Sequence, residues 1–429
     1  MLTEETLEKS EHAETVPPRH ISPHAQAFLI ITAFLGVMGL GLFSPILLFI
    51  VRPYVHDPRD LAATVGWLSA SYAACQFLAA PGLGLLSDRF GRRPILLICL
   101  FGSAVGYLLF GFGGALWVFF LGRIIDGLTG GNISILFAYV GDVVPPEKRG
   151  AFFGRLGAIV GIGFIIGPAI GGFAARISLQ TPVFLAVGVT IITMLFGIFV
   201  LPESLPPEHR VQRVRMRDLN PFTQLAKVFQ IPQIRWLLVT GFCYYLPFSI
   251  LLTTMGVLAY EKLHWNPAEL GLSSLAVGGT DILVQGLLVP RLLPRLGEIR
   301  QAIIALVGVF ASYLLFSMVA FVASPIVLII AIILFAGCGG LAEPALAALL
   351  SRAIDPRQQG VVQGGSQSIS ALAMTIGPLL GGILYTNLGA SVPFWADAVV
   401  ISAAIAIIAL FVRGTLTQTP TPDDVASQI

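Results

Sequence analysis

Residues 150–172 read GAFFGRLGAIVGIGFIIGPAIGG, and residues 360–382 read GVVQGGSQSISALAMTIGPLLGG. The two segments align without a gap at an offset of 210 residues, and both end in Gly-Pro-x-x-Gly-Gly. The same offset places Gly127 on Gly337 in the preceding apolar stretches. A repeat of this kind indicates a chain built from two related halves, and the apolar character of both copies favours halves made of membrane helices.

Composition supports the same conclusion. Of 429 residues, 56% are hydrophobic and only 11% are charged, whereas an average soluble domain has about 25% charged residues. Because a bilayer supplies an apolar solvent, most of the chain is expected to cross it. Twelve apolar stretches are long enough to do so, at 25–51, 64–86, 94–114, 116–141, 152–175, 182–201, 234–258, 268–290, 299–321, 324–351, 359–384 and 392–412. The chain is therefore predicted to be an all-α membrane protein with twelve transmembrane helices in two pseudo-symmetric six-helix bundles.

The polar segments divide the chain into five parts. Residues 202–233 are expected to link a bundle at 25–201 to a bundle at 234–413, and residues 1–24 and 414–429 are expected to be tails. Cytoplasmic loops carry an excess of Lys and Arg. With the N-terminus in the cytoplasm, 20 of the 25 basic residues lie on that side and four lie outside, namely Arg52, Arg59, Arg176 and Lys262. Both termini are therefore predicted to be cytoplasmic, in a multi-pass protein of an inner membrane.

The loop after the second span reads GLLSDRFGRR over residues 84–93. A carboxylate near a helix N-terminus gains from the helix dipole, and a neighbouring arginine can hold it. The arginines alone could reflect the bias of cytoplasmic loops. That explanation leaves out Gly84, which would allow close helix approach, and also Asp88 and Gly91.

This loop resembles the signature loop of the major facilitator superfamily, in which it latches the two halves together on the cytoplasmic side. The resemblance implies a cytoplasmic gate formed by Gly84, Asp88, Gly91, Arg92, Arg93 and Asp142. It places Asp88 against the start of the eleventh helix and Asp142, at the end of the fourth, beside Arg92.

The fifth span carries a second pattern, Gly154-x8-Gly163-x3-Gly167-Pro168-x2-Gly171-Gly172. Glycines at every fourth position form a smooth stripe for close helix packing, and Pro168 favours a bend. Such stripes are common packing surfaces in membranes. At every position, however, the pattern is similar to the motif of the drug:proton antiporter branches of the superfamily.

From residue 82 to 203, and more loosely from 265 to 385, the chain resembles the tetracycline/proton antiporters. The substrate-site acids of that group do not carry over, since Gly36, Gly106 and Ser312 stand at those positions. Asp281 stands where that group has a histidine. The resemblance therefore implies the antiporter branch and leaves the cargo open.

A charge in the hydrocarbon region costs several kcal/mol, so each deep acid needs an explanation. We select Glu343, Asp126 and Asp281, in that order, as proton-coupling candidates. Asp126 lies three residues from Arg123 on a neighbouring part of one helix face. The two could form a neutral structural pair, or Asp126 could release its proton as Arg123 approaches. Glu343 lies nine residues before Arg352, roughly 13 Å along a helix, so it is either protonated or faces an aqueous cavity.

In the family, the first, fourth, seventh and tenth helices line that cavity, which would place Asp126 and Glu343 on opposing walls. A buried packing role remains open for each of the three acids. The seventh span also carries Phe242, Tyr244, Tyr245 and Phe248, which can stack on planar or cationic molecules. Ordinary packing explains these aromatic residues equally well. Together with Asn132 they are the substrate-cavity candidates.

The predicted function is export of small amphiphilic molecules in exchange for protons, by alternating access of the two bundles. A symporter or facilitator for a sugar, peptide or lipid headgroup would keep the fold, and a non-transporting membrane sensor is a more distant alternative. The chain has no nucleotide loop, no cluster with metal-ligand spacing and no nucleophile paired with a base. We therefore expect no enzyme activity, cofactor or bound metal. The expected partners are a small organic substrate, protons and lipid, without nucleic acid, and the chain is expected to be a monomer.

Overall fold

The computed structural model describes residues 23–144, 146–211, 234–353 and 359–412, together with 220, 222, 226 and 229–232. The predicted tails, 1–24 and 414–429, lie outside the described residues except for 23 and 24. Most of the predicted linker beyond residue 211 also lies outside them.

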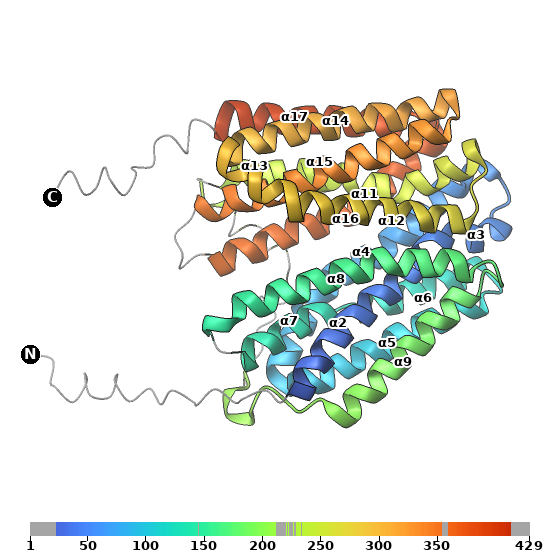
Figure 1. Cartoon of the computed structure of the whole chain (residues 1–429). Coiled ribbons are helices and arrows are strands. Elements are labelled where there is room, and N and C mark those ends of the chain that lie inside the picture. The colour runs from blue at the N-terminus through green and yellow to red at the C-terminus, as the bar shows by residue number, and fades with distance from the viewer. Residues whose placement is uncertain are drawn as a thin grey trace, which may run out of the picture.

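Two bundles of helices make up the described part of the chain (Figure 1). The N-terminal half contains α2 (Pro23–Phe43), α3 (Leu47–Val51), α4 (Leu61–Phe90), α5 (Arg92–Phe112), α6 (Leu116–Leu128), α7 (Asn132–Val143), α8 (Pro146–Ala174) and α9 (Thr181–Val200). The C-terminal half contains α11 (Arg235–Leu263), α12 (Pro267–Leu283), α13 (Val289–Leu296), α14 (Glu298–Val322), α15 (Pro325–Arg352), α16 (Gln359–Leu388) and α17 (Val392–Ile407). The predicted fold class, all-α with twelve crossings, is confirmed.

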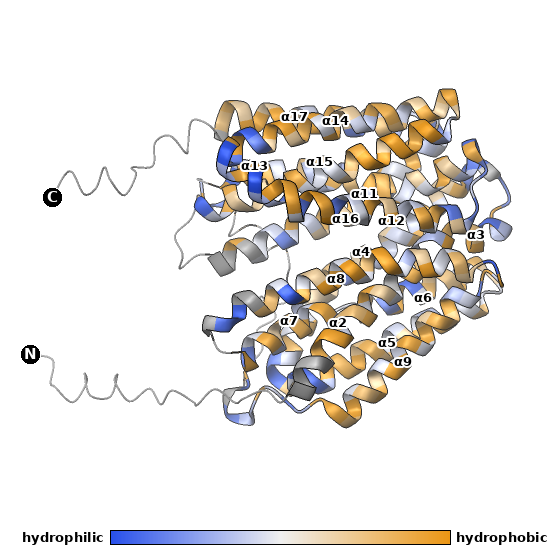
Figure 2. Cartoon of the chain, in the orientation of Figure 1, coloured by the Kyte–Doolittle hydropathy of each residue, from blue (hydrophilic) through white to orange (hydrophobic). Residues whose placement is uncertain are grey.

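Eleven of these crossings in the described residues are long and apolar enough to span a bilayer on composition alone. The remaining crossing, α4, has 30 residues but is richer in alanine, glycine and serine. Large apolar side chains cover the outside of the bundles, including Phe112 (75% exposed), Phe199 (83%) and Phe321 (74%). Figure 2 shows this apolar surface along the helices and hydrophilic residues gathered at the two ends. The protein is therefore a multi-pass membrane protein.

The fourth crossing is broken, although a continuous helix was predicted over 116–141. The Thr129 hydroxyl donates to the Ile125 carbonyl at 2.8 Å, and the Gly130 amide turns back to the Gly127 carbonyl at 3.1 Å. Two consecutive glycines, the second being Gly131, weaken the helix at this point because glycine loses more backbone entropy than other residues. α6 therefore ends before a new helix, α7, begins.

The first and eighth crossings are also irregular. A 3-10 turn over Ser44–Ile46 separates α2 from α3, where Pro45 lacks the amide that a continuous helix needs. A π-helical turn over Val284–Leu288 joins α12 to α13. Such turns inside α-helices are frequent at functional sites.

One end of the molecule carries most of the basic residues of the described loops, among them Arg89, Arg93, Arg291 and Arg352, and we call it the basic end. α2 begins and the last crossing finishes at this end, on the left in Figure 1. We call the other end, with Arg176 and Lys262, the opposite end.

At the opposite end, α4 of one half crosses α16 of the other through two glycines. A methyl group on Gly66 would lie 3.3 Å from the Gly382 α-carbon, and a methyl on Gly382 would lie 2.7 Å from the Ala62 carbonyl oxygen. Thr386 follows on α16, where its hydroxyl accepts from the Ala63 amide at 3.2 Å and donates to the Arg59 carbonyl at 3.1 Å. The two backbones thus meet with no room for side chains.

α8 and α12 make a second crossing with the same construction. A methyl group on Gly271 would lie 3.2 Å from the Gly172 α-carbon and 2.5 Å from the Pro168 carbonyl oxygen. Gly172 and Gly382 are equivalent in the 210-residue repeat. The repeat therefore places two matched contacts between the halves at the opposite end.

Toward the basic end, α8 parts from α12. Ile165 and Gly278 still lie in close contact. One to three turns nearer the basic end, Gly154, Gly157 and Gly161 face open space among the described residues. α4 stays close to the C-terminal half as far as Phe77, which packs in a cluster with residues of α11 and α16. The halves are closed at the opposite end and diverge at the basic end.

Candidate functional site

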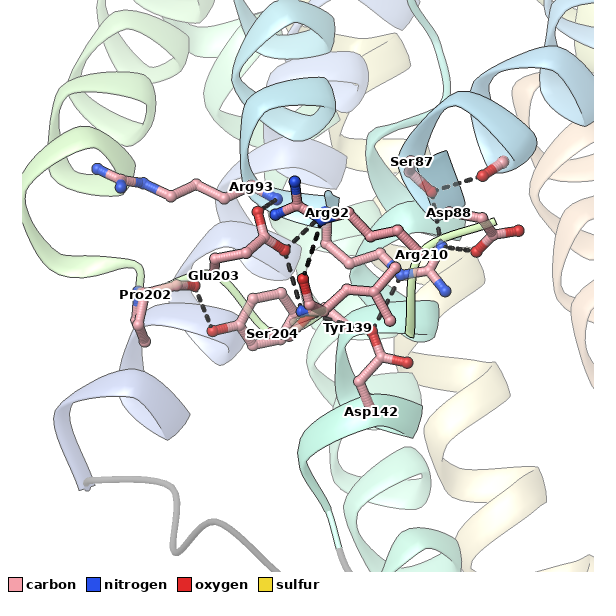
Figure 3. A network of polar contacts seen from close by, with 12 residues as sticks. Ser87, Asp88, Arg92, Arg93, Tyr139, Asp142, Pro202, Glu203, Ser204 and Arg210 are labelled. Carbon is pink, nitrogen blue, oxygen red and sulfur yellow. Dashed lines mark hydrogen bonds and ion pairs between the residues drawn. The ribbon is translucent and has the colours of Figure 1, made fainter. Parts of the chain in front are cut away.

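Arg92 is the centre of a polar network at the basic end (Figure 3). Its Nη1 lies 2.6 Å from the Asp88 carboxylate and donates to the Ser87 hydroxyl at 2.6 Å, while its Nε donates to Asp142 at 3.0 Å. The Ser204 hydroxyl also donates to Asp142, at 3.0 Å. The structure thus brings together three predicted gate residues from α4, α5 and α7.

Glu203, which is far from α5 in the sequence, caps the start of that helix. Its carboxylate accepts the backbone amides of Arg92 at 2.8 Å and Arg93 at 3.2 Å, both of which would otherwise lack helical partners. Gly91 precedes them with φ +106°, and a side chain there would collide with the same carboxylate. Glycine is therefore required at 91 for its conformation and for space. Glu203 is not among the residues predicted for the gate, because its role depends on a contact between residues that are far apart in the chain.

One expectation for the gate is not met in this conformation. Gly84 was expected to allow close helix approach, yet it faces open space among the described residues, because the halves diverge at this end. Asp88 binds Arg92 in its own half. Most side chains at the start of α16 lie outside the described residues, so the predicted contact of Asp88 with that helix stays a prediction.

The glycine pattern of α8 packs in two directions. Methyl groups on Gly163 and Gly167 would lie 2.9 Å and 2.7 Å from carbonyl oxygens of α2, and Gly171 also lies against α2. Gly172 instead faces α12 of the other half, and Gly154 is exposed. The pattern therefore joins α8 to its own bundle and closes the opposite end.

A buried ion pair lies inside the N-terminal half. Arg123 and Asp126 of α6 are 7% and 3% exposed, with 3.8 Å between guanidinium and carboxylate. The guanidinium also lies over the rings of Phe43, Tyr72 and Phe110, at 4.1, 5.2 and 5.6 Å from their centroids. Aromatic faces stabilise a desolvated cation, so Arg123 is held by both charge and rings.

The surroundings of Asp126 explain one departure from the tetracycline/proton antiporters. A methyl group on Gly106 would lie 2.9 Å from the Asp126 β-carbon and 2.7 Å from the Gly122 carbonyl oxygen. An acid at position 106 would therefore have no room. Asn132 lines a small space of about 10 Å³ with Ser103, next to this pair.

The C-terminal half contains a cavity of about 130 Å³ between α11, α15 and α16. Its lining residues are Leu237, Leu238, Gly241, Tyr245, Glu343, Leu346, Ala347, Leu350, Ser366, Gln367 and Ile369. Glu343 is the single charged residue in this lining, and its carboxylate accepts a hydrogen bond from the Tyr245 hydroxyl at 3.3 Å. The walls are otherwise mainly apolar.

Asp281 lies near this cavity on α12. The Gln285 amide donates to both of its carboxylate oxygens at 2.9 Å. A methyl group on Gly340 would lie 2.6 Å from one of these oxygens, which places Asp281 one turn from Glu343 along α15. Glu343 and Asp281 are therefore neighbours, whereas Asp126 is enclosed in the other half and lines no wall of this cavity. The expected opposing pair is not formed here.

Of the four predicted aromatic residues, Tyr245 alone lines the cavity. Tyr244 is only 6% exposed, and Phe248 stacks on Phe335 at 6.0 Å inside the C-terminal half. Phe242 packs beside two apolar clusters. Tyr244 and Tyr245 are successive residues of α11, so they lie about 100° apart around the helix and have different surroundings. In this conformation Tyr244 and Phe248 do not line this cavity, and their role in substrate binding stays a prediction.

Sequence analysis also overlooked an acid. Asp397 lies inside the last predicted span, on α17, and is 0% exposed. Neither carboxylate oxygen has a hydrogen-bond partner among the described residues. Because a buried charge is costly in a membrane, Asp397 belonged among the proton-coupling candidates for the same reason as the other three acids.

Two six-helix bundles related by a parallel repeat, joined by matched glycine crossings at one end, are typical of membrane transporters. The chain belongs to the Major Facilitator Superfamily, whose family model matches residues 29–374 and 323–428. Because this is a transporter family, the prediction that the protein is no enzyme is confirmed.

Individual relatives show which members of the superfamily this chain resembles. The chain is 33% identical to the class C tetracycline resistance protein of Escherichia coli over 395 residues, covering 91% of this chain and 96% of that protein. It is 28% identical to multidrug resistance protein 2 of Bacillus subtilis (strain 168), covering 88% and 92%. A crystal structure of the human organic anion transporter MFSD10 matches with a TM-score of 0.69 and 25% identity, covering 90% of this chain and all of that one. The predicted relationship to the tetracycline/proton antiporters is confirmed.

Proposed function

We propose that this protein exports small amphiphilic organic molecules in exchange for protons, with its basic end in the cytoplasm of a prokaryotic cell. The observation that carries the proposal is Glu343, a lone acid in a mainly apolar cavity. Apolar walls with a few placed polar groups are typical of small-molecule sites. The relatives named for tetracycline and multidrug resistance support export.

Glu343 supplies a means of coupling. A charged carboxylate favours a substrate with a cationic group, whereas a protonated one leaves that group without a counter-charge in a site of low polarity. The Tyr245 hydroxyl, which donates to Glu343, stabilises the charged form. Proton and substrate would therefore occupy the site alternately, as antiport requires.

The described conformation fits the loading step. The glycine crossings close the opposite end, while α8 and α12 diverge toward the basic end. The cavity reaches from Glu343 to Leu237 and Leu350 near the basic ends of their helices. A substrate in the cytoplasm or the inner leaflet would enter from that side.

The related human structure is described as an organic anion transporter. The cavity lining of this chain contains no lysine, arginine or histidine. An acid without a base in the cavity disfavours anions by like-charge repulsion, so we propose cations or weak bases as the cargo.

Reconstituted liposomes with an imposed proton gradient test this proposal. Amphiphilic cationic dyes should move against protons, and internal pH should change only when dye is present. Movement of dye and protons in the same direction would exclude antiport and favour a symporter.

Replacement of Glu343 by glutamine should lower gradient-driven transport at least tenfold while counterflow of dye persists, since the neutral side chain cannot release a proton. Glu298 supplies a matched control, because it pairs with Arg352 at 2.8 Å at the basic end, away from the cavity. E298Q should retain driven transport. Full driven transport by E343Q would show that another group couples the proton.

A further inference from the structure

Asp397 is a buried carboxyl that the proposed mechanism does not use. It lies five residues into α17 from the opposite end, about 7.5 Å along the helix, and α17 packs on α11 and α14. Burial without hydrogen-bond partners is unfavourable for a polar group and more so for a charged group. A native protein retains such a group only where something else requires it.

No counter-charge faces Asp397 in the described part of its bundle. Tyr313 of α14 lies in one buried cluster with Phe394 and Ala398, which flank Asp397; it is also 0% exposed, and its hydroxyl also lacks a partner among the described residues. The other helices packed on α17 carry Tyr244 on α11 and Tyr385 on α16, whose hydroxyl donates to Glu261 at 2.7 Å. The basic residues of these helices are confined to the helix ends, at Arg235, Lys262 and Arg300. Asp397 is therefore enclosed without the arginine that accompanies Asp126, and a charge on it would have no partner there.

The internal repeat shows that packing does not require an acid here. Aligning Pro182 of α9 with Pro393 of α17 places Ala186 on Asp397, and Ala186 is 1% exposed. An alanine thus fills the equivalent position in the N-terminal half.

The tyrosine beside Asp397 is repeated in the other half. Residues 107–110 and 313–316 both read YLLF, and both segments follow a glycine of positive φ, Gly91 or Gly297, at the same spacing. Tyr107 follows Gly106, which packs against Asp126, and Tyr313 lies in one buried cluster with Phe394 and Ala398, which flank Asp397 on α17. Each half therefore pairs this tyrosine with a buried acid, although the two acids come from non-equivalent helices.

Polar groups lead from Asp397 toward the cavity. Tyr313 and Tyr244 belong to the same cluster of buried residues, and the Tyr244 hydroxyl lies 3.5 Å from the Gly339 carbonyl of α15. The Tyr244 ring lies 5.3 Å from that of Tyr245, which hydrogen-bonds Glu343. This is a line of phenols through an otherwise apolar bundle.

We propose that Asp397 is a second proton-binding carboxyl of the transporter, connected to the Glu343 cavity by Tyr313 and Tyr244. The step is reversible protonation of one carboxylate oxygen, so one proton is gained or lost and no other bond changes. The inference rests on the proposed proton exchange. Asp397 would carry one proton per transport cycle in addition to the proton carried by Glu343.

The test compares Asp397→Asn with wild type in proteoliposomes, with dye and proton fluxes measured together. Asparagine keeps the shape of a neutral carboxyl but cannot exchange its proton. We expect D397N to retain dye counterflow and to lose about one proton per dye molecule. An unchanged proton-to-dye ratio in D397N would overturn the inference.

Two further measurements cover other outcomes. If D397N does not fold, the Tyr313→Phe variant tests the inference instead, because this change removes only a hydroxyl. Driven transport several-fold slower at unchanged counterflow supports the route, and an unchanged rate overturns it. If wild type moves dye without protons, the proposed antiport fails. The infrared band of a protonated carboxyl, present in wild type and absent in D397N, would then still show whether Asp397 binds a proton, and its absence from wild type would overturn the inference.

Discussion

The glycine crossings at the opposite end allow a prediction about alternating access. Replacing Gly271 with alanine puts a methyl group 2.5 Å from the Pro168 carbonyl oxygen, whereas ordinary contacts begin at 3.4 Å. α8 and α12 would have to separate by the difference, about 0.9 Å, and a backbone carbonyl cannot turn aside as a side chain can. Overpacking of this kind costs about 1–3 kcal/mol. Because the cost arises only when the opposite end is closed, the ratio of closed to open states should fall by roughly 5–150-fold.

Spin labels can measure that ratio. Positions 177 and 262 are exposed at the opposite end, one in each half, and the labels require a background without the four native cysteines. In G271A the distance distribution between them should shift to longer values, and driven export should slow because resetting to the loading state becomes unfavourable. Gly279→Ala is the matched control on the same helix, since Gly279 faces open space among the described residues. The reasoning is wrong if G271A keeps the wild-type distances, or if G279A shifts them equally.

Three further predictions concern stability, measured by thermal or denaturant unfolding in detergent. Gly91→Ala should destabilise by roughly 1–3 kcal/mol from backbone conformation alone, with a further cost from its collision with Glu203. Gly84→Ala should be close to neutral, and equal effects of the two changes would refute the argument. Glu203→Ala should cost about 0.5–2 kcal/mol because the α5 cap is lost, and no loss would show that water replaces the cap. Arg123→Ala should cost about 3–5 kcal/mol by leaving Asp126 unpaired. Adding Asp126→Asn should recover part of that loss, and a purely additive double variant would contradict pairing.

The fold class could be predicted from the sequence because the patterns that indicate it extend over many residues. This holds for the length of the apolar spans, the distribution of basic residues and the 210-residue repeat. Breaks within spans were missed because they depend on one or two residues. Pro45 and the Gly130–Gly131 pair are visible in the sequence, but glycine and proline are tolerated in many continuous membrane helices.

The candidate site was only partly predictable, for a reason specific to membranes. In a soluble helix, polarity marks the face that is exposed, but here lipid and core are both apolar. Tyr244 and Tyr245 therefore look equivalent in sequence, although one is in the core and the other lines the cavity. The role of Glu203 was hard to predict for a different reason. Its carboxylate accepts hydrogen bonds from backbone amides that lie 111 and 110 residues away in the chain.

The two halves show where the repeat is kept and where it is broken. The glycine crossings are matched, Gly172 with Gly382, because a two-fold arrangement closes one end only if both contacts form together. The buried acids are not matched, since Asp126 has Arg123 while Asp397 has no counter-ion among the described residues. The contacts that close the opposite end are thus shared by both halves, whereas the buried acids are specific to each half. Under the proposed proton exchange, the two halves would therefore contribute different proton-binding groups.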